Sequence, residues 1–252
     1  MSEHVLVERA EGILTLRMNR LDKKNALTQA MYAGMAEVLE QAQDDRSVRV
    51  VLIRGDERCF TAGNDLSDFL QASSGGGLDN SVLRFMHALF EFRKPVVAAV
   101  AGPAVGIGTT LLLHCDLVYV SRDARLKMPF VNLGLCPEYG SSLILPRLVG
   151  QARAAQLLML GEEFNGEQAA AWGIANEALA DGAATLARAE EMARRFLSLA
   201  PSALEVTKRL MRAPDREELR RVIAEEGELF GQRLRSPEAI EAMSAFMRKR
   251  QP

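Results

Sequence analysis

A repeated order of short apolar runs, glycine-containing loops and helical stretches is the feature that most constrains the fold. The runs Arg49–Arg54, Val96–Val100 and Leu117–Ser121 are short and rich in β-branched residues, a pattern typical of buried strands. Helical segments intervene between them, so we expect parallel strands in successive layers of strand, strand and helix. This order predicts an α/β fold.

Local signals place the other elements. Val5–Arg9 and Ile13–Met18 alternate in polarity and predict a β-hairpin, and Thr28 is a candidate N-cap for a helix that ends near Asp44. The remaining expected elements are short helices at Leu66–Leu70 and Thr109–Cys115, a helix at Asn80–Phe92, a strand at Leu126–Met128 and a loop at Ala101–Gly108.

From about Ser141 the chain is predicted to be helical. Its last three amphipathic helices are expected at Pro201–Met211, Asp215–Phe230 and Pro237–Lys249. Because no low-complexity linker interrupts the chain, residues 1–197 are interpreted as a core and residues 198–252 as a helical appendage. Such a tail packs against its own domain or against neighbouring subunits.

Composition excludes several classes of protein. The 252 residues are 48% hydrophobic and 25% charged, with a net charge of −2, which favours neither nucleic acid nor an anionic membrane as partner. Cys59, Cys115 and Cys136 are widely spaced, a pattern typical of reduced thiols rather than of disulfides or a zinc site. With no signal-like N-terminus and no apolar run of membrane-spanning length, we expect a cytoplasmic protein with no membrane association.

Two glycine-containing loops, Cys59–Leu66 and Ala101–Gly108, each follow a predicted strand and precede a predicted helix. Glycine lets backbone N–H groups turn outward toward a ligand, so the two loops together could form an oxyanion hole. They are equally consistent with plain tight turns. The second loop lacks the third glycine and the Gly-Lys-Ser/Thr of phosphate-binding motifs.

Seven segments, taken together, resemble the crotonase (enoyl-CoA hydratase/isomerase) superfamily in order and spacing. They are Phe60–Leu66, Lys94–Gly102, Cys115–Leu117, Gly134–Pro137, Pro146–Gly150, Ala169–Asn176 and Phe246–Arg250. The resemblance covers nearly the whole chain. It implies an α/β, crotonase-like spiral of β-β-α units (residues 1–197) with a C-terminal helical oligomerisation region (residues 198–252). It also implies a homotrimer or dimer of trimers that acts on an acyl-CoA thioester, with CoA as part of the substrate, no separate cofactor and no metal.

The resemblance assigns the oxyanion donors to the backbone N–H groups of Asn64 and Ile107. An enzyme of this kind removes a weakly acidic proton next to a thioester, which leaves negative charge on the carbonyl oxygen. Each preorganised donor aimed at that oxygen is worth about 3 kcal/mol.

The position of the acid indicates which reaction is expected. Hydratases of the family carry two glutamates, but the matching positions here are Thr110 and Phe130. An acid stands instead at Glu138, in a stretch that resembles the peroxisomal-type Δ3,Δ2-enoyl-CoA isomerases, where one glutamate moves a proton between C2 and C4. From the residues alone, Glu138 is also consistent with a surface loop carboxylate or an N-cap of the helix near Ser141. An apolar pocket would raise its pKa toward the working pH.

For the CoA thioester, the resemblance implies binding along the two loops, the turn before the first helix and the C-terminal helix. The candidates are Lys24, Ala26, Ala62, Gly63, Asp65, Leu66, Gly106, Phe130, Leu133, Phe246 and Lys249. Phe130 and Leu133 are expected to wall the pocket, and Phe246 and Lys249 to reach a neighbouring subunit's site. Alternatively, Asp65 caps a helix and Lys249 belongs to a solvated helix end.

These observations predict an enoyl-CoA isomerase that moves a Δ3 double bond to trans-Δ2 in acyl-CoA catabolism. A hydratase, a hydrolase or a ring isomerase of the same superfamily is an alternative. A non-catalytic protein that binds acyl-CoA or a partner is an alternative of a different class. His114 and Asp116 are expected to serve packing and structure rather than catalysis.

Overall fold

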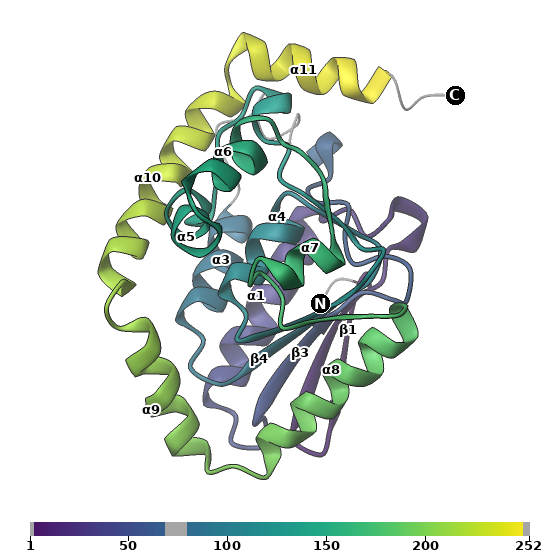
Figure 1. Cartoon of the computed structure of the whole chain (residues 1–252), viewed down its shortest axis with the longest axis vertical. Coiled ribbons are helices and arrows are strands. Elements are labelled where there is room, and N and C mark those ends of the chain that lie inside the picture. Colours follow the sequence, from purple (N-terminus) through teal and green to yellow (C-terminus); the bar gives the residue numbers. More distant parts are fainter. Residues whose placement is uncertain (1–2, 69–79, 249–252) are drawn as a thin grey trace.

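The computed structural model describes residues 3–68 and 80–248, and its centre is a six-stranded sheet (Figure 1). The sheet has the order β1-β2-β3-β4-β6-β9, with β1 and β2 antiparallel and every later neighbour parallel. The strands are β1 (Val5–Ala10), β2 (Ile13–Met18), β3 (Val50–Arg54), β4 (Val96–Val100), β6 (Leu117–Ser121) and β9 (Glu177–Leu179). The predicted hairpin and parallel strands are therefore confirmed.

A second, smaller sheet lies beside the first, with the order β5-β7-β8. Its strands are β5 (Pro103–Val105), β7 (Arg125–Lys127) and β8 (Phe164–Asn165). The first and second glycine loops both reach this region, because Thr61 forms a parallel bridge to Ala104 of β5. The smaller sheet thus holds the two loops next to each other.

Each face of the large sheet is covered by helices. Helix α8 (Gly182–Leu197) packs against β3, β4 and β6, where Leu52, Val97 and Ala193 share one buried cluster (Figure 1). Helices α1 (Gln29–Asp44) and α3 (Asn80–Glu91) contact each other and contribute to the larger cluster that covers the opposite face. The Thr28 hydroxyl accepts a hydrogen bond from the Met31 N–H, so the predicted N-cap is confirmed.

The structure corrects the predicted loop at Ala101–Gly108. Residues 103–105 form β5, because Pro103 and Val105 pair with β7, a partner that no local pattern identifies. The helix expected from Thr109 begins earlier. Helix α4 (Ile107–Thr110) follows Gly106, whose φ of 57° is accessible to glycine, and a 3-10 helix, η2 (Leu111–His114), continues it. Residues 66–68 are helical, and the rest of the helix expected at Leu66–Leu70 lies outside the described residues.

The second half of the chain is helical, as predicted. The helices are α5 (Ser141–Val149), α6 (Gln151–Met159), α7 (Gly166–Ala171), α9 (Pro201–Arg212), α10 (Arg216–Leu234) and α11 (Pro237–Arg248). In Figure 1, α9, α10 and α11 follow one another around the edge of the molecule. The predicted boundary at residues 197 and 198 falls where α8 ends.

The C-terminal helices pack against the chain's own core. Helix α10 contacts α5, and α11 contacts the 3-10 helix η3 (Val131–Leu133). Arg233 Nε donates a hydrogen bond of 2.9 Å to the Gly134 carbonyl oxygen, and a Cβ added at Gly134 would lie 2.8 Å from the Ala239 backbone. Within residues 3–68 and 80–248, no helix combines the length and the apolar character that a membrane crossing requires.

Candidate active site

The two glycine loops lie against each other through backbone hydrogen bonds. The Thr61 N–H donates to the Pro103 carbonyl at 2.9 Å, and the Val105 N–H donates to the Thr61 carbonyl at 3.1 Å. Gly63, with a φ of 85°, approaches so closely that an added Cβ would lie 2.6 Å from the Val105 carbonyl oxygen. Glycine at this position therefore permits both the left-handed backbone and the contact.

A third segment fixes the first loop from the other side. Leu27 N–H donates to the Gly63 carbonyl at 2.8 Å, and the Asp65 N–H donates to the Leu27 carbonyl at 2.9 Å. The fully buried Asn25 side chain donates to the carbonyls of Cys59 and Phe60. Because these bonds clamp the loop on both sides of Asn64, its backbone has little freedom.

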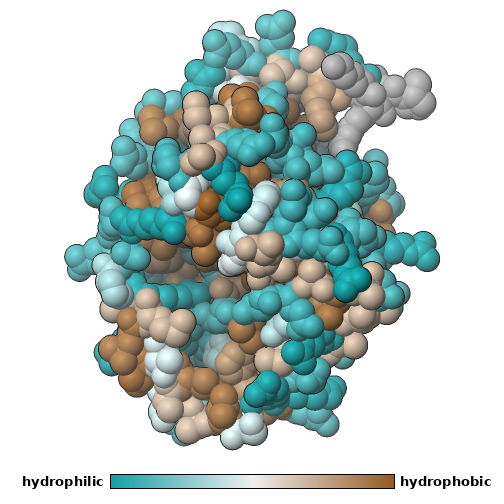
Figure 2. Space-filling view, viewed as in Figure 1, coloured by the Kyte–Doolittle hydropathy of each residue, from teal (hydrophilic) through white to brown (hydrophobic). Residues whose placement is uncertain are grey.

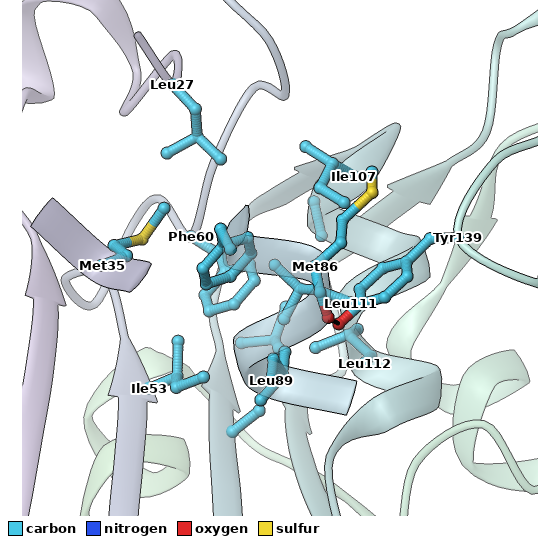
Figure 3. Packing of buried hydrophobic residues seen from close by; sticks show 14 of the residues in the cluster. Leu27, Met35, Ile53, Phe60, Met86, Leu89, Ile107, Leu111, Leu112 and Tyr139 are labelled. Carbon is cyan, nitrogen blue, oxygen red and sulfur yellow. Dashed lines mark hydrogen bonds between the residues drawn. The ribbon is translucent and has the colours of Figure 1, made fainter. Parts of the chain in front are cut away.

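Each of the two predicted oxyanion donors, Asn64 and Ile107, directly follows a glycine with positive φ in one of the paired loops. Among the described residues, no group accepts a hydrogen bond from the backbone N–H of Asn64 or of Ile107. The side chains are directed elsewhere. Asn64 Oδ1 accepts a hydrogen bond from the Tyr32 hydroxyl, and Ile107 is buried in the core (Figure 3). Two unused N–H groups on adjoining loops are the arrangement that an anion or oxyanion requires.

Glu138 is buried rather than exposed, with 5% of its surface accessible. The surface-loop alternative is therefore wrong, and the carboxylate does not cap α5, since Ser141 bonds to the Glu138 carbonyl instead. The Thr110 hydroxyl donates a hydrogen bond to Glu138 Oε1. Burial raises the pKa of Glu138 to about 8; the Thr110 hydrogen bond acts against this shift and the negative charge of Glu226 adds to it.

Residues after Glu138 form a left-handed turn. Tyr139 and Gly140 have φ values of 58° and 75°, and left-handed backbone at a bulky residue such as tyrosine is uncommon. The Tyr139 hydroxyl donates to the Met86 carbonyl at 2.7 Å (Figure 3), and its ring stacks on His114 at 3.7 Å. These contacts of a fully buried ring hold the turn and hence the Glu138 backbone.

His114 is a packing residue, as its place in an apolar helix indicated. Its Nε2 lies 2.7 Å from the Tyr139 carbonyl, which can only accept, so Nε2 carries the proton of a neutral ring. Burial lowers the pKa of His114 to about 3, with a further small effect of the Arg212 charge and an opposing one of this hydrogen bond. Asp116 also has a structural role, since it pairs with Lys208 and Arg212 at 2.7 and 2.9 Å.

Apolar side chains border the second loop. Phe130 is buried, and a Cβ added at Gly106 would lie 3.8 Å from its ring. The ring also packs edge-on against Phe230 of α10, with 6.3 Å between centroids. Leu133 is half-buried against the same core. A groove of about 610 Å³ lies nearby between α3 and α10, and Met86, which accepts the Tyr139 bond, is part of its lining.

Six of the predicted CoA contacts, Lys24, Ala26, Ala62, Gly63, Asp65 and Leu66, belong to the first loop and to the turn that pairs with it. Lys24 and Ala26 belong to the turn that pairs with the first loop, where the Ala62 N–H donates to the Lys24 carbonyl at 2.9 Å. Asp65 forms an ion pair of 2.6 Å with Arg20 and accepts a hydrogen bond from the Ser67 N–H, so its carboxylate caps the helical residues 66–68 that begin at Leu66.

The C-terminal candidates lie apart from this group in the chain. Phe246 is near the end of α11 and partly exposed, and Lys249 lies outside the described residues.

Three further residues contribute to the site, and of these only Thr110 was singled out by the family resemblance. Tyr32 lies among the buried residues of α1 and bonds to Asn64; Thr110 donates to Glu138; and Glu226 of α10 bonds to the turn after Glu138. Tyr32 and Glu226 look like ordinary residues of amphipathic helices. Only the fold reveals their partners, which lie 32 and 86 positions away.

Comparison with known proteins identifies the family. The model of the enoyl-CoA hydratase/isomerase family matches residues 8–252. The chain belongs to the enoyl-CoA hydratase/isomerase family. Its α/β fold is that of the crotonase superfamily: a solved structure titled Pseudomonas aeruginosa OdaA superposes with a TM-score of 0.95 and 69% identity, over 98% of this chain and 99% of that one.

Curated relatives of this family member have several activities. The 1,2-epoxyphenylacetyl-CoA isomerase of Escherichia coli is 36% identical over 100% of this chain and 98% of its own length. Rat enoyl-CoA delta isomerase 2 is 34% identical over 99% of this chain and 64% of the relative. The E. coli 2,3-dehydroadipyl-CoA hydratase is 32% identical over 100% of this chain and 98% of the relative. The family thus supports an acyl-CoA hydratase or isomerase, with the reaction to be decided by the site.

Proposed function

We propose that the protein is an enoyl-CoA isomerase that shifts a Δ3 double bond of an acyl-CoA thioester to the trans-Δ2 position. The observation that carries the proposal is the buried carboxyl of Glu138, which accepts a hydrogen bond from Thr110, the residue at the position where hydratases carry a glutamate. Phe130 replaces the other hydratase acid. One carboxyl suffices for a 1,3-proton shift, because the proton that it takes is the one that it returns.

The proposed steps use this chain's own groups. The Glu138 carboxylate removes a proton from C2, and the electrons of that C–H bond form a dienolate whose charge rests on the thioester oxygen. The N–H groups of Asn64 and Ile107 donate to that oxygen. The dienolate then takes the same proton from Glu138 at C4, which leaves the double bond between C2 and C3.

We also propose where the substrate lies. The CoA portion follows the surface formed by Lys24, Ala26 and Ala62, next to the paired loops. The acyl tail enters the groove of about 610 Å³ between α3 and α10, which is lined by apolar side chains such as Leu83 and Ile223. The enzyme is proposed to act in the cytoplasm as a homotrimer or a dimer of trimers, with Phe246 facing a neighbour's CoA.

The test compares two substrates and one variant. Purified protein receives 3-hexenoyl-CoA and crotonyl-CoA, and we expect isomerisation of the first and far slower hydration of the second. Glu138→Gln should lower isomerisation by at least about 100-fold, since general base catalysis contributes 10²–10⁴-fold, while CoA thioester binding is retained. An unchanged rate in this variant contradicts the assignment. Thioester binding without any reaction would favour a non-catalytic protein.

A ring isomerisation is the second candidate, because a relative 36% identical over the whole chain is a 1,2-epoxyphenylacetyl-CoA isomerase. A single carboxyl beside an oxyanion hole could serve that reaction as well. The two are separated by offering the protein both 3-hexenoyl-CoA and 1,2-epoxyphenylacetyl-CoA. We expect kcat/KM to be higher for the linear substrate, and the reverse ranking would favour ring isomerisation.

A further inference from the structure

A buried carboxylate of the C-terminal region reaches the turn that carries Glu138. Glu226 of α10 has 6% of its surface accessible. One of its carboxylate oxygens accepts a hydrogen bond from the Gly140 N–H, and the other accepts one from the Ser142 N–H at 2.9 Å. Gly140 is the N-cap of α5, so Glu226 satisfies two of the N–H groups that the start of a helix leaves unpaired.

The turn needs such an anchor. Tyr139 and Gly140 are both left-handed, and a Cβ added at Gly140 would lie 2.3 Å from the Leu219 side chain, also of α10. The strained turn therefore packs against α10 on one side, and on the other side the Tyr139 hydroxyl donates a hydrogen bond to α3. Glu138 immediately precedes it, so the position of its carboxyl depends on both helices.

We propose that Glu226 is a positioning residue for the proton transfer by Glu138: it fixes the Tyr139–Gly140 turn to α10 and so sets the place of the carboxyl over the substrate. This inference rests on the proposed function of Glu138. Both oxygens of Glu226 accept hydrogen bonds from backbone N–H groups of the turn, so its proposed role is to position Glu138 rather than to transfer a proton itself. The C-terminal helical region thereby takes part in the active site of its own chain.

Electrostatics link the two carboxyl groups as well. Burial raises the pKa of Glu226, whereas its hydrogen bonds from Ser142 and Gly140 oppose the shift. The titratable groups facing this pair are Tyr32 of α1, Cys136 and Tyr139 of the loop, and Glu225 of α10. Because the Glu226 charge raises the pKa of Glu138, its removal should let Glu138 ionise at lower pH.

The experiment measures kcat, KM and the pH profile of isomerisation for the full-length protein and three variants. Glu226→Gln keeps one acceptor oxygen and removes the charge. Glu226→Ala removes the charge and both acceptor oxygens. Glu217→Gln is the matched control, because Glu217 is exposed on the same helix and forms no hydrogen bond or ion pair with another described residue. Circular dichroism and thermal unfolding report the folded fraction of each variant at the assay temperature.

We expect kcat to fall about 10-fold in Glu226→Gln and further in Glu226→Ala, with KM within about twofold of the wild type, as for a displaced catalytic group. The acid limb of the Glu226→Gln profile should move to lower pH, a change that a merely structural role does not produce. If Glu226→Ala does not fold, the Gln variant alone decides. The inference is wrong if Glu226→Gln keeps the wild-type kcat and the acid limb of its pH profile does not move. It is also wrong if the loss of rate equals the loss of folded protein.

Deuterium exchange at C2 separates this inference from the proposed function. The wild type is incubated with 3-hexenoyl-CoA in D₂O and followed by NMR. If the wild type neither isomerises nor exchanges, the role of Glu138 is wrong and the inference falls with it. If the wild type does both and Glu226→Gln does so equally fast, only the role of Glu226 is rejected.

Discussion

At the scale of single residues, the Glu138 carboxyl is held between opposing influences. Burial raises its pKa to about 8, and the Thr110 hydrogen bond limits the rise. A base must be ionised, so kcat/KM should increase as the pH rises toward 8. Stability changes in the opposite direction. The folded protein binds this proton more tightly than the unfolded chain, and the resulting stabilisation, complete below the ordinary glutamate pKa of 4.5, is lost as the pH rises through about 8.

Thr110→Val tests the balance directly. The valine has a similar shape but cannot donate to Glu138, so the pKa of Glu138 should rise further and the acid limb of kcat/KM should move to higher pH. At pH 7 the rate should fall at least about tenfold, since a hydrogen bond to a charged group contributes about 1.5–3 kcal/mol and one pKa unit corresponds to about 1.4 kcal/mol. Thr110→Ser, which keeps the hydroxyl, is the control. If the acid limb of kcat/KM lies at the same pH in Thr110→Val and Thr110→Ser, the hydroxyl does not act on Glu138.

At the scale of elements, the site depends on the close approach of the two glycine loops. Gly63 and Gly150 allow this dependence to be measured, because their φ values are 85° and 82°. A Cβ at Gly63 would lie 2.6 Å from the Val105 carbonyl oxygen, whereas a Cβ at Gly150 would meet nothing within 4 Å. Positive φ strains an alanine at either position, but only Gly63→Ala also forces the loops apart.

We expect Gly150→Ala to lower the free energy of unfolding by about 1–3 kcal/mol, because its φ of 82° and ψ of 153° lie in a region occupied almost only by glycine, and to leave kcat unchanged. Gly63→Ala should lower it further and reduce kcat at least about tenfold, because the Asn64 N–H moves relative to that of Ile107. Urea unfolding and steady-state kinetics on both variants provide the comparison. Equal kcat in the two variants would mean that the spacing of the loops does not matter for the reaction.

The elements also show what local sequence can and cannot predict. The hairpin, the parallel strands and the Thr28 cap were predictable because periodicity and capping are local properties. Strand β5 was not, since Pro103–Val105 is a strand only through its pairing with Arg125–Lys127. The site follows the same division. The family resemblance singled out Glu138 as the candidate acid. The contact between Glu226 and the turn after Glu138 exists only in the folded molecule, so no local pattern predicts it.

At the scale of the whole molecule, the C-terminal helices both complete the core and leave apolar surface exposed. Figure 2 shows apolar side chains at the lower left of this face, where Figure 1 places α9. The exposed large apolar side chains of this region are Leu199, Val206, Leu210, Met211, Leu229, Ile240 and Phe246. A monomer in water would leave this surface uncovered, so its burial between chains is expected to stabilise an assembly.

Sedimentation at micromolar concentration should therefore give the mass of three or six chains. Leu210→Glu should shift the protein toward monomers, because Leu210 is 62% exposed on α9 and a buried unpaired carboxylate opposes association. Met159→Glu is the matched control, since Met159 is 67% exposed but lies on α6, outside the C-terminal region. A monomeric wild type, or equal dissociation of the two variants, would contradict assembly through the tail. Loss of isomerase activity on dissociation would further indicate that a neighbouring chain completes the site.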